Sequence, residues 1–108
     1  MGRGRDMIIG RRGDSLTGRL IEQTFDIQSD LGKLKITTDR IAWIHFRNPP
    51  QAPEDEIWLI NGDRLSGVIE QEAVEFQPDG GDPRRIPRER IHTLMIGQGV
   101  DLKALPLG

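Results

Sequence analysis

The sequence predicts an all-β protein built as two tandem five-stranded small barrels that pack together. Two observations lead to this fold class. The segment Arg-Gly-Asp-Ser-Leu-Thr-Gly at 12–18 recurs as Asn-Gly-Asp-Arg-Leu-Ser-Gly at 61–67, a spacing of 49 residues. Glycine or proline also interrupts almost every apolar run, and no run keeps the spacing of one helix face for three turns. Because turn glycines and apolar positions recur, the repeat specifies a shape rather than a chemistry.

The repeat continues beyond this segment and sets the boundaries of two units. Phe25 corresponds to Val74 at the same spacing. One extra residue in the second copy then lengthens the spacing to 50, so that Ile44 corresponds to Leu94. We therefore divide the chain into a flexible basic arm at 1–6, β-repeat 1 at 7–48, a Pro-rich linker at 49–53, β-repeat 2 at 54–97 and a C-terminal tail at 98–108.

The first two strands of repeat 2 form a predicted hairpin. Strands at 57–60 and 64–71 flank the pair Asn-Gly at 61–62, which favours a tight turn because both turn residues need positive φ. A glycine inside the second strand requires a sharp bend or a close backbone approach as the sheet curls. The turn and bend glycines predicted in the two repeats are Gly13, Gly18, Gly62 and Gly67.

The remaining strands of repeat 2 are short. A third strand carries Val74 and Phe76, and a loop at 78–83 separates it from a fourth strand through Ile86. A fifth strand turns Leu94 and Ile96 inward. Repeat 1 has predicted strands near 7–12, 15–22, 24–28, 33–38 and 41–47.

Composition narrows the classes of protein. Only 35% of the 108 residues are apolar, so we expect the halves to pack on each other or copies of the chain to associate. The absence of cysteine excludes disulfides and thiolate metal sites. No apolar run is long enough to cross a membrane, and the apolar run at 7–9 is too short for a signal peptide. We therefore expect a cytoplasmic protein without membrane contact.

The net charge of −2 conceals an asymmetry between the halves. Residues 1–48 contain nine Lys and Arg against six Asp and Glu, whereas residues 54–97 contain five against ten. This difference favours head-to-tail contact between copies, or it describes an ordinary solvated surface. Arginine makes up most of the basic residues, and its guanidinium suits bidentate pairing with carboxylate or phosphate.

One segment of repeat 2 resembles a known family. Ile-Trp-Leu-Ile-Asn-Gly-Asp-Arg-Leu-Ser-Gly-Val-Ile at 57–69 is similar to the first motif of Sm-like proteins, especially the bacterial RNA chaperone of that family. The later Arg-Ile-His-Thr-Leu-Met-Ile at 90–96 resembles that family's fourth and fifth strands. The resemblance implies small SH3-like barrels that assemble into rings. The family's nucleotide-contacting motif is replaced here by Ile-Pro-Arg-Glu-Arg at 86–90, so ring building is expected to survive without the RNA site.

Two tryptophans are candidates for an interaction surface. If Ile44 and Phe46 point inward, strand alternation turns Trp43 and His45 to the opposite face. Trp58 opposes its apolar neighbours in the same way. Outward tryptophans suit a seam between the repeats, a self-assembly interface or a platform for unpaired bases. The predicted interface residues are Trp43, His45, Trp58 and Ile60.

Other polar residues are expected to have local roles. Asp14 and Asp63 follow turn glycines on separate hairpins, where aspartate usually accepts nearby backbone amides. Arg40 and Arg90 either bind phosphate or pair with the acidic residue that precedes each of them. Two histidines without a third ligand make a poor zinc site. We expect no catalytic residue, no metal and no cofactor.

The sequence thus predicts a non-enzymatic module that self-associates as a ring or a stack, with another protein as a further possible partner. The alternative is binding of single-stranded RNA, which the acidic balance of the chain disfavours. The arginines assigned to that alternative are Arg3, Arg5, Arg11, Arg12, Arg40 and Arg90.

Overall fold

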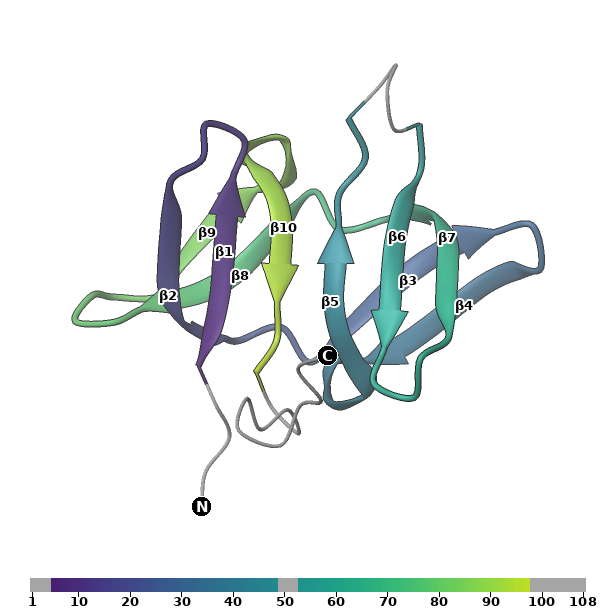
Figure 1. Cartoon of the computed structure of the whole chain (residues 1–108), viewed down its shortest axis with the longest axis horizontal. Coiled ribbons are helices and arrows are strands. Elements are labelled where there is room, and N and C mark those ends of the chain that lie inside the picture. The colour runs from purple at the N-terminus through teal and green to yellow at the C-terminus, as the bar shows by residue number, and fades with distance from the viewer. Residues whose placement is uncertain (1–4, 49–52, 98–108) are drawn as a thin grey trace, which may run out of the picture.

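The computed structural model describes residues 5–48 and 53–97. These residues form one curled, barrel-like antiparallel sheet of ten strands without an α-helix, which confirms the all-β prediction (Figure 1). Residues 1–4 of the predicted arm, most of the predicted linker and the predicted tail at 98–108 lie outside the described residues. The strands are β1 (Asp6–Gly10), β2 (Ser15–Leu20), β3 (Thr24–Ser29), β4 (Gly32–Thr37), β5 (Ile41–His45), β6 (Asp55–Leu59), β7 (Arg64–Ile69), β8 (Ala73–Pro78), β9 (Arg84–Pro87) and β10 (Ile91–Met95).

Each repeat contributes five strands and one short turn of 3₁₀-helix. The turns η1 (Thr38–Arg40) and η2 (Arg88–Arg90) precede β5 and β10. Two pairs of corresponding strands have the same burial pattern over their whole length, β1 with β6 and β2 with β7. The pairs β3 with β8 and β5 with β10 share their inward positions but differ in the exposure of the others. The sequence repeat therefore becomes a structural repeat, strand by strand.

The strand order differs from a simple tandem arrangement, in which each repeat would form its own sheet. The order is β4-β3-β7-β6-β5-β10-β1-β2-β8-β9. The hairpin β1–β2 therefore lies beside β8, β9 and β10 of the other repeat, and the hairpin β6–β7 lies beside β3, β4 and β5. We call these two groups of five strands the first and second half-sheets. Each hairpin is thus exchanged, because it pairs with strands of the other repeat. Since both repeats carry the same type of hairpin, sequence alone does not show whether a hairpin pairs with its own repeat or with the other.

The half-sheets meet where β5 pairs with β10. Figure 1 shows the two groups side by side, joined along these strands. Ile44 pairs with Leu94, and these two residues are equivalent in the repeat. An antiparallel pairing of equivalent residues places an approximate two-fold axis at this point. The exchange and the axis together make the two repeats a single interlocked body.

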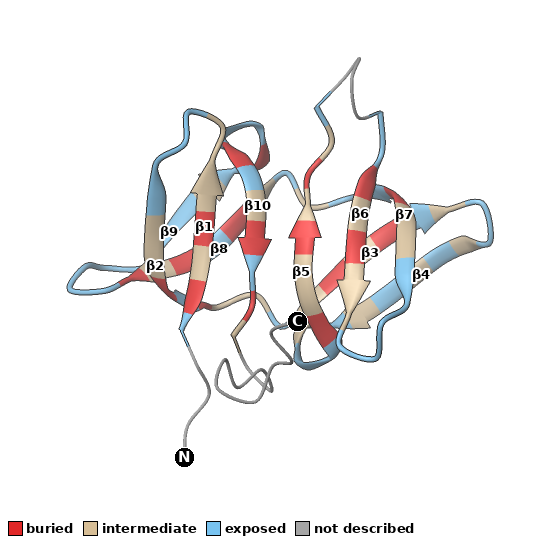
Figure 2. Ribbon diagram, viewed as in Figure 1, coloured by how far each residue is buried: buried red, intermediate tan, exposed pale blue. Residues whose placement is uncertain are grey.

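The core follows the inner faces of both half-sheets (Figure 2). Most inward residues predicted from the repeat are buried, whereas the equivalent residues Ile36 and Ile86, on the edge strands β4 and β9, are only partly buried. The buried apolar side chains are Ile8, Leu20, Phe25, Ile27, Ile41, Ile44, Phe46, Ile57, Ile69, Val74, Phe76, Ile91, Leu94 and Ile96. Within the described residues, no helix has the length and apolar character needed to cross a membrane.

Two glycines allow the exchanged hairpins to approach the other repeat. A β-carbon on Gly18 would lie 2.1 Å from the carbonyl oxygen of Gln77 in β8. A β-carbon on Gly67 would lie 2.3 Å from the carbonyl oxygen of Gln28 in β3. The glycine in the middle of the second strand of each repeat is thus required by backbone contact with the other repeat.

The other two predicted glycines occupy the hairpin turns. Gly13 has a φ of +90° and Gly62 a φ of +97°, in the region that disfavours side chains with a β-carbon. The prediction that both residues of the Asn-Gly pair have positive φ is wrong for Asn61, because only glycines have positive φ among the described residues. The turn therefore needs left-handed geometry at Gly62 alone, which glycine adopts without steric cost.

A buried aspartate at the start of each repeat accepts hydrogen bonds from backbone amides of other segments. Asp6, which the sequence analysis placed in the arm, opens β1 and is 1% exposed. Its carboxylate accepts the backbone N–H of Leu20 at 2.7 Å and that of Gly97 at 2.9 Å. Asp55 opens β6 and accepts the corresponding amides, from Ile69 at 2.7 Å and Arg47 at 2.6 Å. Each carboxylate thus accepts one amide from the last residue of a neighbouring strand, Leu20 or Ile69, and one from a residue just beyond another strand.

We predict that Gly67→Ala destabilises the fold by about 1–3 kcal/mol, because the new methyl group clashes with the backbone of β3. Gly81→Ala is the matched control, since the nearest atom to a β-carbon there is 3.7 Å away. Urea unfolding of both variants measures the difference. Equal stability of the two variants would contradict the close approach.

Candidate interaction surface

The strongest surface feature is a row of side chains on the outer face of the sheet. Alternation along each strand places one residue per strand on this face, and cross-strand pairing aligns them. Trp43 pairs with Trp58 on one side and with Met95 on the other. Met95 in turn pairs with Met7, so the row continues into β1. We call this set the outer row: Met7, Met95, Trp43, Trp58 and Arg64.

The two predicted interface tryptophans are brought together. Their rings stack with centroids 4.9 Å apart and planes 17° apart. The guanidinium carbon of Arg64 lies 5.4 Å from the ring centre of Trp58. Because β6 lies between β5 and β7, Trp43 and Arg64 flank Trp58 from opposite sides. Both faces of the Trp58 indole are therefore covered within the chain, and its ring nitrogen is buried as well.

The predicted interface residue His45 lies beside this row. Its ring centre is 6.4 Å from that of Trp43 and 4.5 Å from that of His92. From the sequence, the two histidines were considered only as a poor zinc site, and no contact between them was predicted. They meet because β5 and β10 pair antiparallel, which aligns His45 with Thr93. The signal that could have found this contact is the two-fold pairing of equivalent strands.

The local electrostatics disfavour a proton on His92. The pKa of His92 is lowered from its ordinary value of 6.5, first by burial and then by the neighbouring His45 and Arg11. A ring nitrogen of His92 lies 2.8 Å from the hydroxyl of Thr93. His45 therefore contacts Trp43 of the outer row, and its partner His92 is influenced by the charge of Arg11 in the β1–β2 turn.

Exposure along the surface is uneven. Met95 is 44% exposed and the two tryptophans are half-buried. Ile60, the fourth predicted interface residue, is 52% exposed but lies in the turn after β6, where its N–H donates to the carbonyl of Arg40. Ile60 therefore extends the apolar surface beyond the end of the strand. Met7 and Met95 were not predicted from the sequence as interface residues.

Three of the six arginines assigned to RNA come together. Arg11, Arg12 and Arg90 line one cavity of about 420 Å³ with Asp14 and Glu89. The guanidinium of Arg11 is already engaged, since it donates to the carbonyls of Glu89 and Arg47, each at 2.7 Å.

The other three arginines are placed elsewhere. Arg5 forms an exposed ion pair with Asp79 at 2.5 Å. Arg40 belongs to η1 in the second half-sheet, at the position equivalent to Arg90. Arg3 lies outside the described residues. The structure thus gathers only part of the predicted nucleic-acid site.

The local roles expected for other charged residues differ from those observed. In the described part of the chain, Arg40 and Arg90 make no ion pair with the acidic residues that precede them. Asp39 instead accepts the hydroxyl of Thr37 at 2.6 Å, because the 3₁₀ turn directs the carboxylate back toward its own start. Asp63 contacts the side chain of Asn61 within the β6–β7 turn.

Neither a metal cluster in the described residues nor a relative among known proteins points to a function. Residues 5–48 and 53–97 contain no group of three or more potential metal ligands. Comparison with family models, curated proteins and solved structures gives no match to this chain. The function must therefore be argued from the geometry of the surface.

We predict that thermal stability falls as the pH is lowered from about 7 to about 5, partly through His92. A lowered pKa means that the unfolded chain binds more protons than the folded chain below pH 6.5. The contribution is therefore present above that pH and is lost as the pH falls through the folded-state pKa. His92→Asn should reduce the slope of the melting temperature against pH. An unchanged slope would show that His92 does not contribute.

Proposed function

We propose that this chain is a non-enzymatic, Sm-like interaction module of two fused five-stranded barrels, which self-associates through the outer row. The observation that supports this proposal is the alignment of two methionines and two stacked tryptophans across four adjoining strands. Aromatic residues and methionine are the types enriched in the centre of protein interfaces. As part of the same proposal, the module acts in the cytoplasm.

Face-to-face contact accounts for assembly better than pairing of sheet edges. The strands β5 and β10 pair with each other in the middle of the sheet, and the strands β4 and β9 form its two edges. The edge β4 carries Lys33 and Lys35, which pair with Glu70 and Asp26. Charged side chains on an edge strand oppose pairing with another chain. We therefore favour a stack or closed dimer over a ring.

The other edge is protected as well. The strand β9 presents Arg84 and Arg85 and ends at Pro87, which has no N–H to donate to a further strand. Contact through the outer row avoids both edges. It also allows an isologous dimer, in which the same surface of two copies meets across a two-fold axis.

We predict that the chain has a native mass larger than its 12.2 kDa at high micromolar concentration, and that Trp58→Glu returns it to a monomer. A carboxylate placed in a desolvated aromatic row opposes association. Light scattering after size-exclusion chromatography measures the mass, and circular dichroism checks the fold.

Leu31→Glu is the matched control, because Leu31 is 87% exposed in the β3–β4 turn, away from the outer row. This variant should keep the mass of the parent. A parent chain that is strictly monomeric would contradict self-association.

The alternative function is binding of single-stranded RNA. The cavity lined by Arg11, Arg12 and Arg90 favours it, because these side chains suit phosphate. The tryptophans oppose it, because Trp43 and Trp58 stack on each other and leave no open indole platform between them for a base.

RNA binding has its own test. If it occurs, a labelled uridine-rich or adenine-rich oligonucleotide binds at low salt and is released steeply as salt rises. The double substitution Arg12→Ala with Arg90→Ala should then weaken binding, whereas Arg64→Ala should not. The self-association proposal expects no shift of either oligonucleotide, so a salt-sensitive shift that depends on Arg12 and Arg90 would favour the alternative.

A further inference from the structure

More arginines surround the β1–β2 turn than the equivalent β6–β7 turn. The β1–β2 turn contains Arg11 and Arg12, and it lies against η2, since the N–H of Arg11 donates to the carbonyl of Arg90 at 3.2 Å. The equivalent turn has Ile60 in place of Arg11, and the N–H of Ile60 donates to the carbonyl of Arg40 at 2.9 Å. The turn therefore forms without an arginine at this position.

The difference extends to three further arginines. Arg12, Arg47 and Arg88 stand where the other repeat has an asparagine, a glycine and a threonine. Arg47 and Arg88 share the buried carboxylate of Asp55, with contacts of 3.1 Å and 2.5 Å. The side chains of Arg12 and Arg90 are exposed and, among the described residues, have neither a hydrogen bond nor an ion pair. Their charges are therefore available to a ligand.

Two adjoining cavities lie beside these arginines. The larger, which we call the arginine cavity, measures about 420 Å³ and is lined by Arg11, Arg12, Asp14, Glu89 and Arg90. The smaller measures about 260 Å³, shares Arg11 and Glu89 with the larger, and adds Arg47, Asn48 and Arg88. Even with Asp55 included, five arginines face three carboxylates around the two cavities. This excess of positive charge favours a negatively charged ligand.

Arg11 has a fixed position on the wall of both cavities. Its Nε donates to the carbonyl of Glu89 and its Nη2 to the carbonyl of Arg47, each at 2.7 Å. Its remaining nitrogen, Nη1, is buried and has no hydrogen-bond partner among the described residues. A buried N–H group without an acceptor costs free energy. An oxyanion bound beside Arg11 would supply that acceptor.

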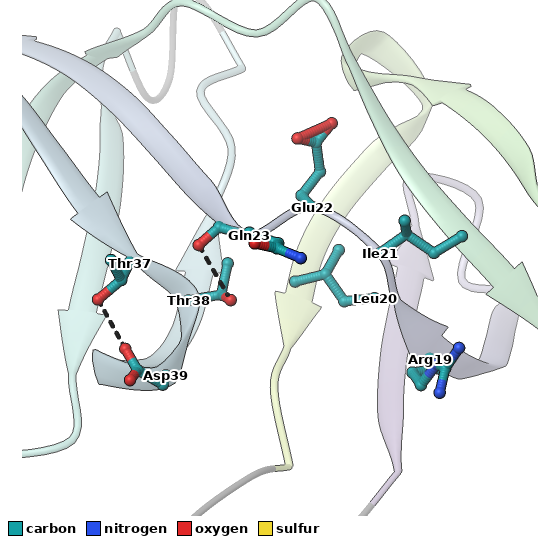
Figure 3. A pocket seen from close by; sticks show the side chains of 8 residues that line it. All are labelled: Arg19, Leu20, Ile21, Glu22, Gln23, Thr37, Thr38 and Asp39. Carbon is teal, nitrogen blue, oxygen red and sulfur yellow. Dashed lines mark hydrogen bonds between the residues drawn. The ribbon is translucent and has the colours of Figure 1, made fainter.

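A cavity beside the other 3₁₀ turn, η1, has the opposite balance of charge. It measures about 490 Å³ and is lined by residues 19–23 and 37–39 (Figure 3). Glu22 and Asp39 are its acidic residues, and Arg19 is the one basic lining residue among those described. Figure 3 shows that Asp39 accepts the hydroxyl of Thr37 there. An excess of arginine thus distinguishes the cavities at η2 from the cavity at η1.

The carboxylates of the arginine cavity limit the kind of anion that fits. Asp14 and Glu89 line this cavity together with the three arginines. If one phosphate of a nucleic-acid strand entered the cavity, the neighbouring phosphates would approach these carboxylates, and like charges repel. A small ligand with one phosphate group has no such neighbours. Guanidinium groups pair bidentately with phosphate oxygens, so the free arginines suit this group.

We propose that the arginine cavity binds a small ligand with a single phosphate group, either inorganic phosphate or a phosphate monoester. Arg12 and Arg90 provide free guanidinium groups, and Arg11 provides a guanidinium that the backbone already orients. The inference goes beyond self-association and does not rest on it, because none of these arginines belongs to the outer row.

The first experiment titrates inorganic phosphate into the parent chain near neutral pH, with sodium chloride keeping the ionic strength constant. We expect saturable shifts of the amide NMR signals of Arg11, Arg12 and Arg90. Arg12→Ala with Arg90→Ala should weaken binding at least about tenfold, because charge-assisted contacts are lost. These two side chains have no contacts that hold the fold, and circular dichroism checks it.

The matched control is Arg19→Ala with Arg40→Ala. This variant loses the same charge, and Arg40 is the residue equivalent to Arg90 in the other 3₁₀ turn. Because both side chains are exposed and lie outside the arginine cavity, the phosphate affinity should stay within about twofold of the parent.

The second experiment removes a carboxylate from the cavity wall. Glu89→Gln keeps the backbone carbonyl that Arg11 contacts, and it should tighten phosphate binding about threefold or more because a like charge is lost. Asp39→Asn is the control, since Asp39 is the equivalent residue in η1, and it should leave the affinity unchanged. Weaker or equal binding by Glu89→Gln would contradict an anion in this cavity.

The third experiment identifies the ligand class. Methyl phosphate represents the monoesters, and tighter binding of methyl phosphate or of inorganic phosphate shows which of the two sources the site prefers. Dimethyl phosphate has one charge and two blocked oxygens, and should bind at least about tenfold more weakly than methyl phosphate. A tri-uridine oligonucleotide without a terminal phosphate serves as the RNA probe and should bind no better than dimethyl phosphate.

The proposal is overturned if phosphate gives no saturable shift at constant ionic strength, if the two double variants weaken binding alike, or if dimethyl phosphate binds as tightly as methyl phosphate. Tighter binding of the oligonucleotide than of methyl phosphate would also overturn it and would assign the cavity to RNA. None of these outcomes depends on the oligomeric state of the chain, so failure of this proposal and failure of self-association are distinguishable.

Discussion

The structure depends on the exchange of hairpins between the repeats. The hairpin β1–β2 joins the sheet of the second repeat through β8, and β6–β7 joins that of the first through β3. Both junctions require an approach that only glycine permits, at Gly18 and Gly67. Neither half-sheet is complete without strands from both repeats. Because one core cluster contains side chains of both repeats, and either repeat by itself would have a marginal core, we expect the chain to unfold as one unit.

The sequence predicted the strands and the buried positions well because both are local properties. Period-two alternation assigns Phe25 and Val74 to the core whatever strand pairs with theirs, and Asn-Gly gives the same turn in any sheet. The exchange could not be predicted, because the two hairpins share their turn glycines and inward residues, so either one fits either repeat by these signals. Asp6 and Asp55 were missed for a related reason. A charged residue at a strand start normally indicates surface, and its burial depends on which amides the topology leaves unpaired.

The candidate sites arise where equivalent positions differ. The positions that the two copies share are mainly turn glycines and core residues, which specify the fold. The positions at which the copies differ can therefore specify contacts with other molecules. Arg11 and Ile60 differ at equivalent turn positions, and the first lines two cavities while the second is an exposed apolar residue. The outer row lies on the face where the repeats have diverged as well. Comparison of the two copies within one chain therefore supplies information that related sequences would otherwise provide.

The divergence of the outer face also argues for one interaction surface rather than two. The approximate two-fold axis relates Trp43 to Thr93 and Trp58 to Ile9. It likewise relates the exposed Met95 to His45, and Met7 to a glutamate. A symmetric chain would present two equal aromatic rows, but the row related to the outer row contains no aromatic side chain other than His45, and it includes the polar Glu56 and Thr93 beside Ile9. Burial of the outer row against a partner thus leaves Glu56 in water, where its carboxylate loses no hydration.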